Sequence, residues 1–260
     1  MQGFWAPLLL VWIASALVMS GVWWWQRRTS NAGFVDVAWA ALLGLAAIYY
    51  ATVGSGALLP RLLIAVLAAT WGFRLGLHLL KRVLHEPEDG RYAHLRNHWQ
   101  GHQGKFFGFF QLQAFSVALF SIPFLIVAGN PHSQVTVWTV LGSLVWVGSL
   151  SGEAIADLQL ARYRADSRNR GITCRLGLWR YSRHPNYFFE WLHWFSYCLL
   201  AIGAPYAWAS LIGPLLMLLT LVFVSGIPFV EAQALRSRGD DYRDYQRTTS
   251  PLIPWFPRKS

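Results

Sequence analysis

Long apolar runs separated by short polar connections dominate the pattern of this sequence. Runs of spanning length lie near residues 4–25, 34–53, 57–80, 107–129, 136–160, 186–204 and 207–230. A hydrocarbon core about 30 Å thick needs roughly 20 consecutive apolar residues per spanning helix. The pattern therefore predicts an all-α membrane protein with about seven transmembrane helices, built as a single integral membrane domain over residues 1–260.

Basic residues occur in alternate connections between these runs. The connections 26–33, 81–106 and 161–185 and the tail after residue 231 contain Lys or Arg, whereas 54–56, 130–135 and 205–206 contain neither. Because connections that stay in the cytoplasm are enriched in Lys and Arg, this alternation predicts an N-terminus outside and a C-terminus in the cytoplasm. The polar, aromatic tail is expected to fold back on the cytoplasmic face.

Composition agrees with a membrane environment, since 55% of the 260 residues are hydrophobic and only 13% are charged. The net charge of +10 is spread over short connections rather than gathered on one soluble face, which argues against a nucleic-acid partner. Cys174 lies in a basic connection and Cys198 in an apolar run, so we expect no disulfide between them. The run 4–25 is predicted to be a retained first span, not a cleaved signal.

Common cofactor and metal motifs are missing from the sequence. It contains no P-loop, no GxGxxG after a strand, no HExxH and no CxxC. His94, His98 and His102 have a helical spacing, but no acidic or cysteine ligand accompanies them. We therefore predict no metal site.

Charged side chains inside the apolar runs are expensive, at roughly 2.5–3.5 kcal/mol each on insertion scales. Asp36, Arg74, Glu153, Asp157 and Glu190 are of this kind. One interpretation is internal ion pairing, for example between Arg74 and Asp36. The alternative is a polar, cytoplasm-facing cavity, because residues four apart share one helix face and Asp157 follows Glu153 at that spacing, as Glu190 follows Asn186.

The connection before the sixth run is rich in arginine. Seven arginines lie within residues 162–183, interleaved with aromatic residues, and Pro185 suits a helix start. Guanidinium groups and a helix N-terminus are typical of phosphate binding. The connection therefore indicates a phosphate-bearing cofactor, although retention of a cytoplasmic connection also requires a few basic residues.

Several motifs resemble a known family. They are DLQLARYRAD at 157–166, GLWRYSRHPNYFFEW at 177–191 and DYRDYQRTTSPLIPW at 241–255, with FVDVAWA and HEPEDGRY earlier in the chain. These segments resemble bacterial membrane proteins grouped with the C-terminal domain of steroid 5α-reductases. The RHPNY core is shared more loosely with isoprenylcysteine carboxyl methyltransferases.

The resemblance implies a seven-span enzyme that binds NADP(H) in a cytoplasm-facing cavity and reduces an activated C=C bond of a steroid-like enone. It places the cofactor-binding half at about residues 150–257. The cofactor-binding residues that it implies are Asp157, Arg164, Tyr181, Arg183, His184, Asn186, Tyr187, Glu190, Tyr242, Tyr245 and Arg247.

The sequence departs from the steroid enzymes where the substrate binds. Those enzymes present a Glu in the second span and a Tyr in the third, and the corresponding residues here are Asp36 and Trp71. An indole N–H is a hydrogen-bond donor but a poor source of a proton. Tyr92 or His78 is therefore expected to replace the missing tyrosine, unless the substrate is not a 3-oxo steroid. The predicted catalytic residues are Asp36, Trp71 and Tyr92.

The resulting hypothesis is an NADPH-dependent reductase of a lipophilic enone that enters from the bilayer, in a bacterial inner membrane. An S-adenosylmethionine-dependent methyltransferase of a lipidic substrate and a non-enzymatic transporter remain as alternatives. The expected partners are this lipophilic substrate and membrane lipids. Neither the substrate nor the oligomeric state follows from the sequence.

Overall fold

The computed structural model describes residues 2–224 and 226–258, and its regular structure is helical throughout these ranges. Besides helices, the described residues contain one isolated parallel bridge, between Ser182 and Ser250. The first half contains α1 (Gln2–Thr29), α2 (Phe34–Val53), α3 (Leu58–His85), α4 (Gly90–His98) and α5 (Gln103–Ala128). The second half contains α6 (Val137–Ala165), η1 (Ser167–Asn169), η2 (Gly177–Arg180), α7 (Pro185–Leu200), η3 (Ala207–Leu211), α8 (Ile212–Leu219), η4 (Thr220–Val224), α9 (Ile227–Arg238) and α10 (Asp240–Thr248).

Six of the described helical segments are long and apolar enough to cross a membrane, which confirms an all-helical membrane protein. They are 5–29, 34–53, 58–85, 103–128, 137–165 and 207–238. The remaining predicted run, 186–204, forms the shorter α7 of 16 residues. It ends at Leu200 because the chain then turns through Gly203, whose φ of +94° suits glycine and few other residues.

The chain divides into two compact units. The first comprises Met1–Val140 with Tyr197–Gly213, and the second comprises Leu141–Ser196 with Pro214–Ser260. The second unit therefore contains most of the segment that the resemblance assigns to the cofactor.

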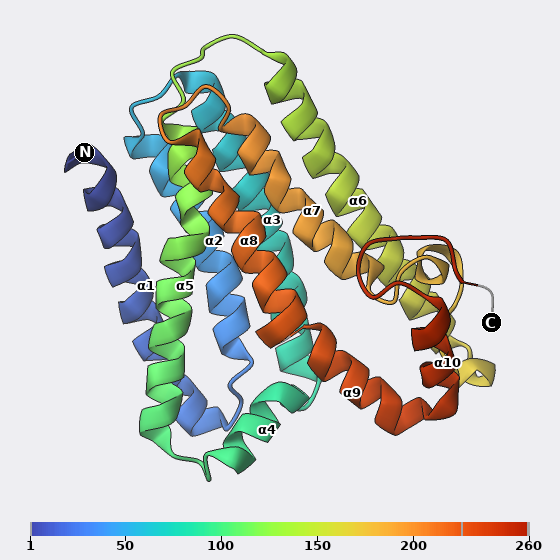
Figure 1. Ribbon diagram of the computed structural model, residues 1–260. Coiled ribbons are helices and arrows are strands. Elements are labelled where there is room, and N and C mark those ends of the chain that lie inside the picture. Colours follow the sequence, from blue (N-terminus) through green and yellow to red (C-terminus); the bar gives the residue numbers. More distant parts are fainter. Residues whose placement is uncertain (1, 225, 259–260) are drawn as a thin grey trace. The chain divides into compact units, whose positions relative to one another are not determined.

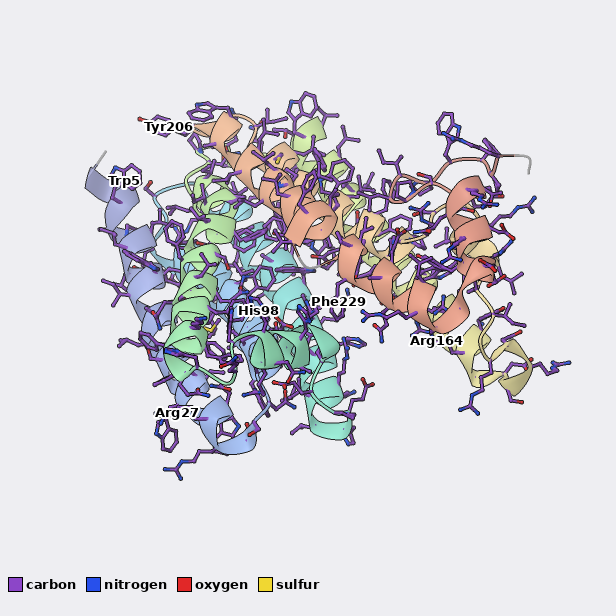
Figure 2. All side chains as sticks on the ribbon, turned by 60° about the horizontal axis from the view of Figure 1, so that its bottom comes forward. Trp5, Arg27, His98, Arg164, Tyr206 and Phe229 are labelled. Atoms are coloured by element: carbon purple, nitrogen blue, oxygen red, sulfur yellow. The ribbon has the colours of Figure 1, made fainter. Side chains whose placement is uncertain are left out.

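The first unit is built around α1, α2, α3 and α5 (Figure 1). The two helices α2 and α3 approach closely at Gly72, where a Cβ atom would lie 2.7 Å from the carbonyl oxygen of Ala40. Figure 2 shows Trp5 and Arg27 at opposite ends of α1. The apolar positions facing the other helices fill the core, and the lipid-facing positions stay apolar, as a membrane solvent requires.

The basic connections of the first unit gather at one end. Gln26 near the end of α1 accepts a hydrogen bond from Arg96 of α4 at 3.4 Å and donates one to Gln103 at the start of α5. Glu88 joins the same end, because it accepts from the Ala32 backbone N–H and pairs with Arg96 at 2.7 Å. The connections 26–33 and 81–106 therefore lie on one side, as the alternation of charge predicts.

The second unit places α6 and α7 against each other through the connection between them. Trp179 in η2 donates its indole N–H to the carbonyl of Ala156 in α6, at 2.9 Å, so the connection folds back along α6. The C-terminal tail then packs on this connection, since the Arg183 N–H donates to the Ser250 carbonyl and the Trp255 N–H donates to the Tyr181 carbonyl. The tail thus folds back, as expected (Figure 1).

Candidate functional site

A charged cluster in the first unit joins α2 to α4. Asp36 lies in the first turn of α2, and Asp89 caps α4 by accepting the Arg91 N–H at 2.9 Å. This cap fixes the first turn of α4 and points its side chains at α2. The Tyr92 hydroxyl donates to Asp36 Oδ1 at 2.6 Å, and Arg91 Nη2 donates to Asp36 Oδ2 at 3.0 Å. Both carboxylate oxygens of Asp36 are therefore acceptors.

The electrostatics of α4 keep Tyr92 protonated. Burial and the neighbouring Asp36 carboxylate raise the pKa of the Tyr92 phenol well above its usual value of 10.0. Burial lowers the pKa of Arg91, but the carboxylates of Asp36 and Asp89 outweigh it and raise the pKa. Burial likewise opposes ionisation of Asp89, yet its bonds to Arg91 leave its pKa lowered. At neutral pH, α4 therefore presents a neutral phenol beside a charged guanidinium.

A small cavity borders this cluster. It has a volume of about 20 Å³, which is room for a water molecule. Its lining comes from the connection before α2, from α2, α3 and α4, and from the segment that leads into α4, namely Asn31, Gly33, Asp36, Leu79, Arg82, Val83, Pro87, Asp89 and Arg91. The side chain of Asp36 is 26% exposed beside this cavity.

Trp71, the third predicted catalytic residue, lies in the core of the first unit. It is fully buried on α3 and packs edge-to-face against Trp39 of α2, with ring centroids 6.1 Å apart. Trp39 in turn donates its indole N–H to Ser116 of α5.

Asp36 contacts Arg91 and Tyr92 instead of Arg74, so the ion pair between Arg74 and Asp36 offered as one interpretation is wrong. The local sequence could not show these partners, because α4 lies over the first turn of α2, 55 positions earlier in the chain.

A second polar cluster, in the second unit, centres on Glu231 of α9. Glu231 Oε1 accepts from Arg183 Nε at 2.6 Å, contacts His184 Nε2 at 3.2 Å and accepts from the Tyr242 hydroxyl at 3.3 Å. Its Oε2 accepts from Gln246 at 2.8 Å. Arg183 also donates from Nη1 to two backbone carbonyls of the tail, so most of its donors are used within the protein.

The predicted tyrosines of α10 serve this second cluster in different ways. Tyr245 is almost fully buried and donates to the backbone carbonyls of Trp179 and Ser182. Burial raises the pKa of Tyr245, and burial together with the Glu231 carboxylate raises that of Tyr242. Both phenols therefore stay protonated. Tyr245 holds α10 to the connection 161–185, and Tyr242 holds α10 to Glu231 of α9.

The polar faces of α6 and α7 meet at the start of α7. Asn186 donates its side-chain N–H to Asp157 Oδ1 at 3.1 Å, which brings two of the predicted cofactor residues together. Tyr187 stacks on His184 with a ring separation of 5.4 Å. α7 begins at Pro185, as expected, so its first-turn N–H groups lie beside this pair.

The arginines of the connection 161–185 are mostly exposed. Three of them form ion pairs within the second unit, Arg168 with Asp166, Arg175 with Asp241 and Arg183 with Glu231. Arg162, Arg164, Arg170 and Arg180 are exposed, and Arg164 lies near the end of α6 (Figure 2). Arg247 is also exposed and pairs with Asp244.

Three of the remaining predicted residues have defined places in the structure. Glu190 lies 3.7 Å from His193 on α7, and Tyr181 packs edge-to-face on Phe256 of the tail. His78, the other substitute offered for the missing tyrosine, lies on α3. Among the described residues, no three His, Cys, Asp or Glu side chains come together as metal ligands.

Sequence reasoning missed Arg91 and Glu231 as members of these clusters. Arg91 adjoins Tyr92 in the motif HEPEDGRY, and its position next to a predicted catalytic residue was the available signal. Glu231 stands out as a carboxylate at the end of an apolar run. Its partners, however, come from residues 47 or 48 positions earlier in the chain and from the tail, and no local pattern connects them.

Comparison with protein families agrees with the extent of this architecture. A family described as "Protein of unknown function (DUF1295)" matches residues 22–249. The chain belongs to this family. The match includes the charged cluster on α2 and α4 and the polar cluster around Glu231. No curated protein matches the chain.

Proposed function

We propose that this protein is an NADPH-dependent membrane reductase of an activated C=C bond in a lipophilic enone, similar to steroid 5α-reductases. The observation that carries the proposal is the hydrogen bond from Tyr92 to Asp36. A carboxylate and a tyrosine that polarise the enone oxygen are the pair that the resemblance requires. Tyr92 supports the proposal because it provides the hydroxyl that Trp71 lacks, from a different helix.

The chain's own residues would polarise the substrate as follows. The Tyr92 hydroxyl has one proton, and in the structure this proton forms the hydrogen bond to Asp36. With substrate bound, the same hydroxyl would donate to the carbonyl oxygen, on which negative charge develops during reduction. Arg91 would remain on Asp36 and balance its charge. The raised pKa of Tyr92 keeps the phenol protonated, so its hydroxyl stays available as a hydrogen-bond donor.

The second unit offers side chains that fit an anionic dinucleotide. Arg162, Arg164 and Arg170 are exposed, and guanidinium groups suit phosphates. Asp157 and Asn186 form a polar pair beside the first turn of α7, which suits ribose or amide groups. Arg183 fits less well, because Glu231 and two carbonyls take most of its donors. Bound NADPH would supply the hydride for the β-carbon of the enone.

We propose that the basic connections and the C-terminus lie in the cytoplasm of a bacterial inner membrane and that the N-terminus lies outside. The alternation of charged and uncharged connections supports this orientation. A lipophilic enone would then approach the first unit from the bilayer, and the cofactor would come from the cytoplasm.

Cofactor binding by the detergent-solubilised protein tests the proposal. A ligand that binds only the folded state raises the melting temperature, so NADPH, NADH and S-adenosylmethionine are compared. We expect stabilisation by NADPH, reduced in Arg164→Gln and retained in Arg168→Gln. The Arg168 variant is a matched control because it removes the same charge from the same connection. Arg168 forms an ion pair with Asp166.

Each outcome separates the candidate functions. Stabilisation by S-adenosylmethionine alone would replace the reductase with a methyltransferase. No response to any of the three ligands would favour a transporter. If NADPH binds, its oxidation with a panel of enones in reconstituted vesicles tests the reaction, and failure with every enone class would contradict the substrate assignment.

A further inference from the structure

The C-terminal tail of the second unit presents aromatic side chains to the surroundings. Trp255 is 71% exposed and Phe256 is 76% exposed, and Ile253 beside them is 55% exposed. Leu252, in contrast, is buried. Single exposed apolar residues need no explanation, but two adjacent large aromatics on a rigid segment call for a partner.

Hydrogen bonds and prolines hold this segment in place. The Ser182 hydroxyl donates to the Leu252 carbonyl at 2.7 Å, the Trp255 N–H donates to the Tyr181 carbonyl at 2.9 Å, and the Arg258 N–H donates to the Thr248 carbonyl at 2.8 Å. Pro251, Pro254 and Pro257 restrict the backbone between these bonds. The exposed rings are therefore presented by an ordered segment and lose little entropy on contact.

The depth of the segment along α6 identifies what the rings meet. Twenty residues of helix rise about 30 Å, the thickness of the hydrocarbon core, so a core that begins at the first residue of α6, Val137, ends near Ala156. Ala156 is the residue whose carbonyl accepts the Trp179 indole N–H. With the core placed in this way, the connection that carries Tyr181, and with it Trp255, lies at the level where hydrocarbon gives way to headgroups.

Charge at the segment matches one kind of membrane surface. Arg180 adjoins Tyr181, Arg258 ends the described tail, and both side chains are exposed. Neither forms an ion pair with any residue in 2–224 or 226–258. Indole and phenyl rings favour the membrane interface, and arginines beside them attract anionic headgroups.

We propose that Ile253, Trp255 and Phe256 insert into the headgroup region of an anionic membrane, with Arg180 and Arg258 on its phosphates. The tail is then an interfacial anchor that holds the connection 177–183 at the membrane surface. This inference does not depend on the proposed reductase activity, because it uses only the exposure, depth and charge of the tail.

Fluorescence quenching in reconstituted vesicles tests the anchor. Cys174→Ala and Cys198→Ala remove the native thiols, and Phe256→Cys then carries an environment-sensitive fluorophore. Asp244→Cys, on the exposed polar face of α10, is the matched control. We expect lipids with a quencher in the upper acyl chain to remove most of the emission at 256 and little at 244. Equal quenching of both positions by aqueous iodide, with none from the lipid, would overturn the proposal.

Contact with a second copy of the chain and contact with uncharged lipid are each tested by a further measurement. Energy transfer between differently labelled copies at 256, in place of lipid quenching, would assign the rings to a second copy and contradict the anchor.

Arg180→Gln and Arg258→Gln should each lower the preference for phosphatidylglycerol over phosphatidylcholine vesicles, measured by quenching, about fivefold. Melting temperatures show whether the labelled variants fold, and a preference unchanged in both arginine variants would refute the contact with anionic headgroups.

Discussion

The two polar clusters differ in how fully their carboxylates are satisfied. Asp36 accepts two hydrogen bonds, from Tyr92 and Arg91, and borders a small cavity. Glu231 contacts four side chains, and its own side chain is 14% exposed. A carboxylate with one open side can exchange a partner for a ligand, whereas a saturated one fixes the chain around it. We therefore propose a role in the chemistry for the first cluster and a role in the architecture for the second.

The largest expected effect is on turnover. Tyr92→Phe removes the hydroxyl proposed to polarise the substrate and should lower kcat by roughly 10²–10⁴, the range of a lost acid–base group. Enone-dependent NADPH oxidation measures it. Tyr50→Phe is the control, because it removes another buried hydroxyl of the first unit, bonded to Ser121. Equal losses of kcat in both variants would point to general damage rather than a role for Tyr92.

The next largest effect is on stability. Glu231→Ala leaves the largely buried Arg183 guanidinium without its carboxylate and should cost about 3–5 kcal/mol in the free energy of unfolding, as broken buried ion pairs do. Thermal or denaturant unfolding in detergent measures this loss. Asp166→Ala, which frees the exposed Arg168, should change it little. A small loss for Glu231→Ala would contradict the architectural role of the second cluster.

A smaller loss should follow removal of one partner of Glu231. Gln246→Ala deletes the bond to Oε2 but leaves Arg183 and His184 in place, so we expect about 1 kcal/mol. The same unfolding measurement applies. A loss as large as that of Glu231→Ala would contradict this ranking, because the backbone carbonyl of residue 246, which Arg183 contacts, stays in the variant.

The smallest effect is a dependence on pH. Burial raises the pKa of Asp241, but the hydrogen bond from the Thr173 backbone N–H and the charge of Arg175 outweigh it, so its folded pKa is lowered from 3.8. Stability from Asp241 is then fully present above pH 3.8 and is lost as pH falls through the folded pKa. The difference in melting temperature between wild type and Asp241→Asn should therefore be constant from about pH 5 to 7 and shrink in stronger acid. A difference that grows in acid would reverse the sign of the pKa shift.

Local pattern determined much of the architecture. Span length and hydropathy predict the all-helical membrane fold, and α2 begins and ends at the predicted residues 34 and 53. The start of α7 at Pro185 also follows from helix-start chemistry. These features are readable because they depend on residues a few positions apart, and because a membrane penalises any polar group that lacks a partner.

Only the tertiary structure decided which distant side chains meet. It brings Tyr92 to Asp36 across 56 positions and Arg183 to Glu231 across 48, and it leaves Trp71 in the core. Such pairings depend on how connections fold back over helix ends, where several carboxylates and arginines compete as partners. The sequence by itself determines the charged residues and the helices that contain them, whereas packing determines which residues pair. A hydrogen bond acts over about 3 Å, and a bond between distant residues cannot be recognised from the periodicity of either segment.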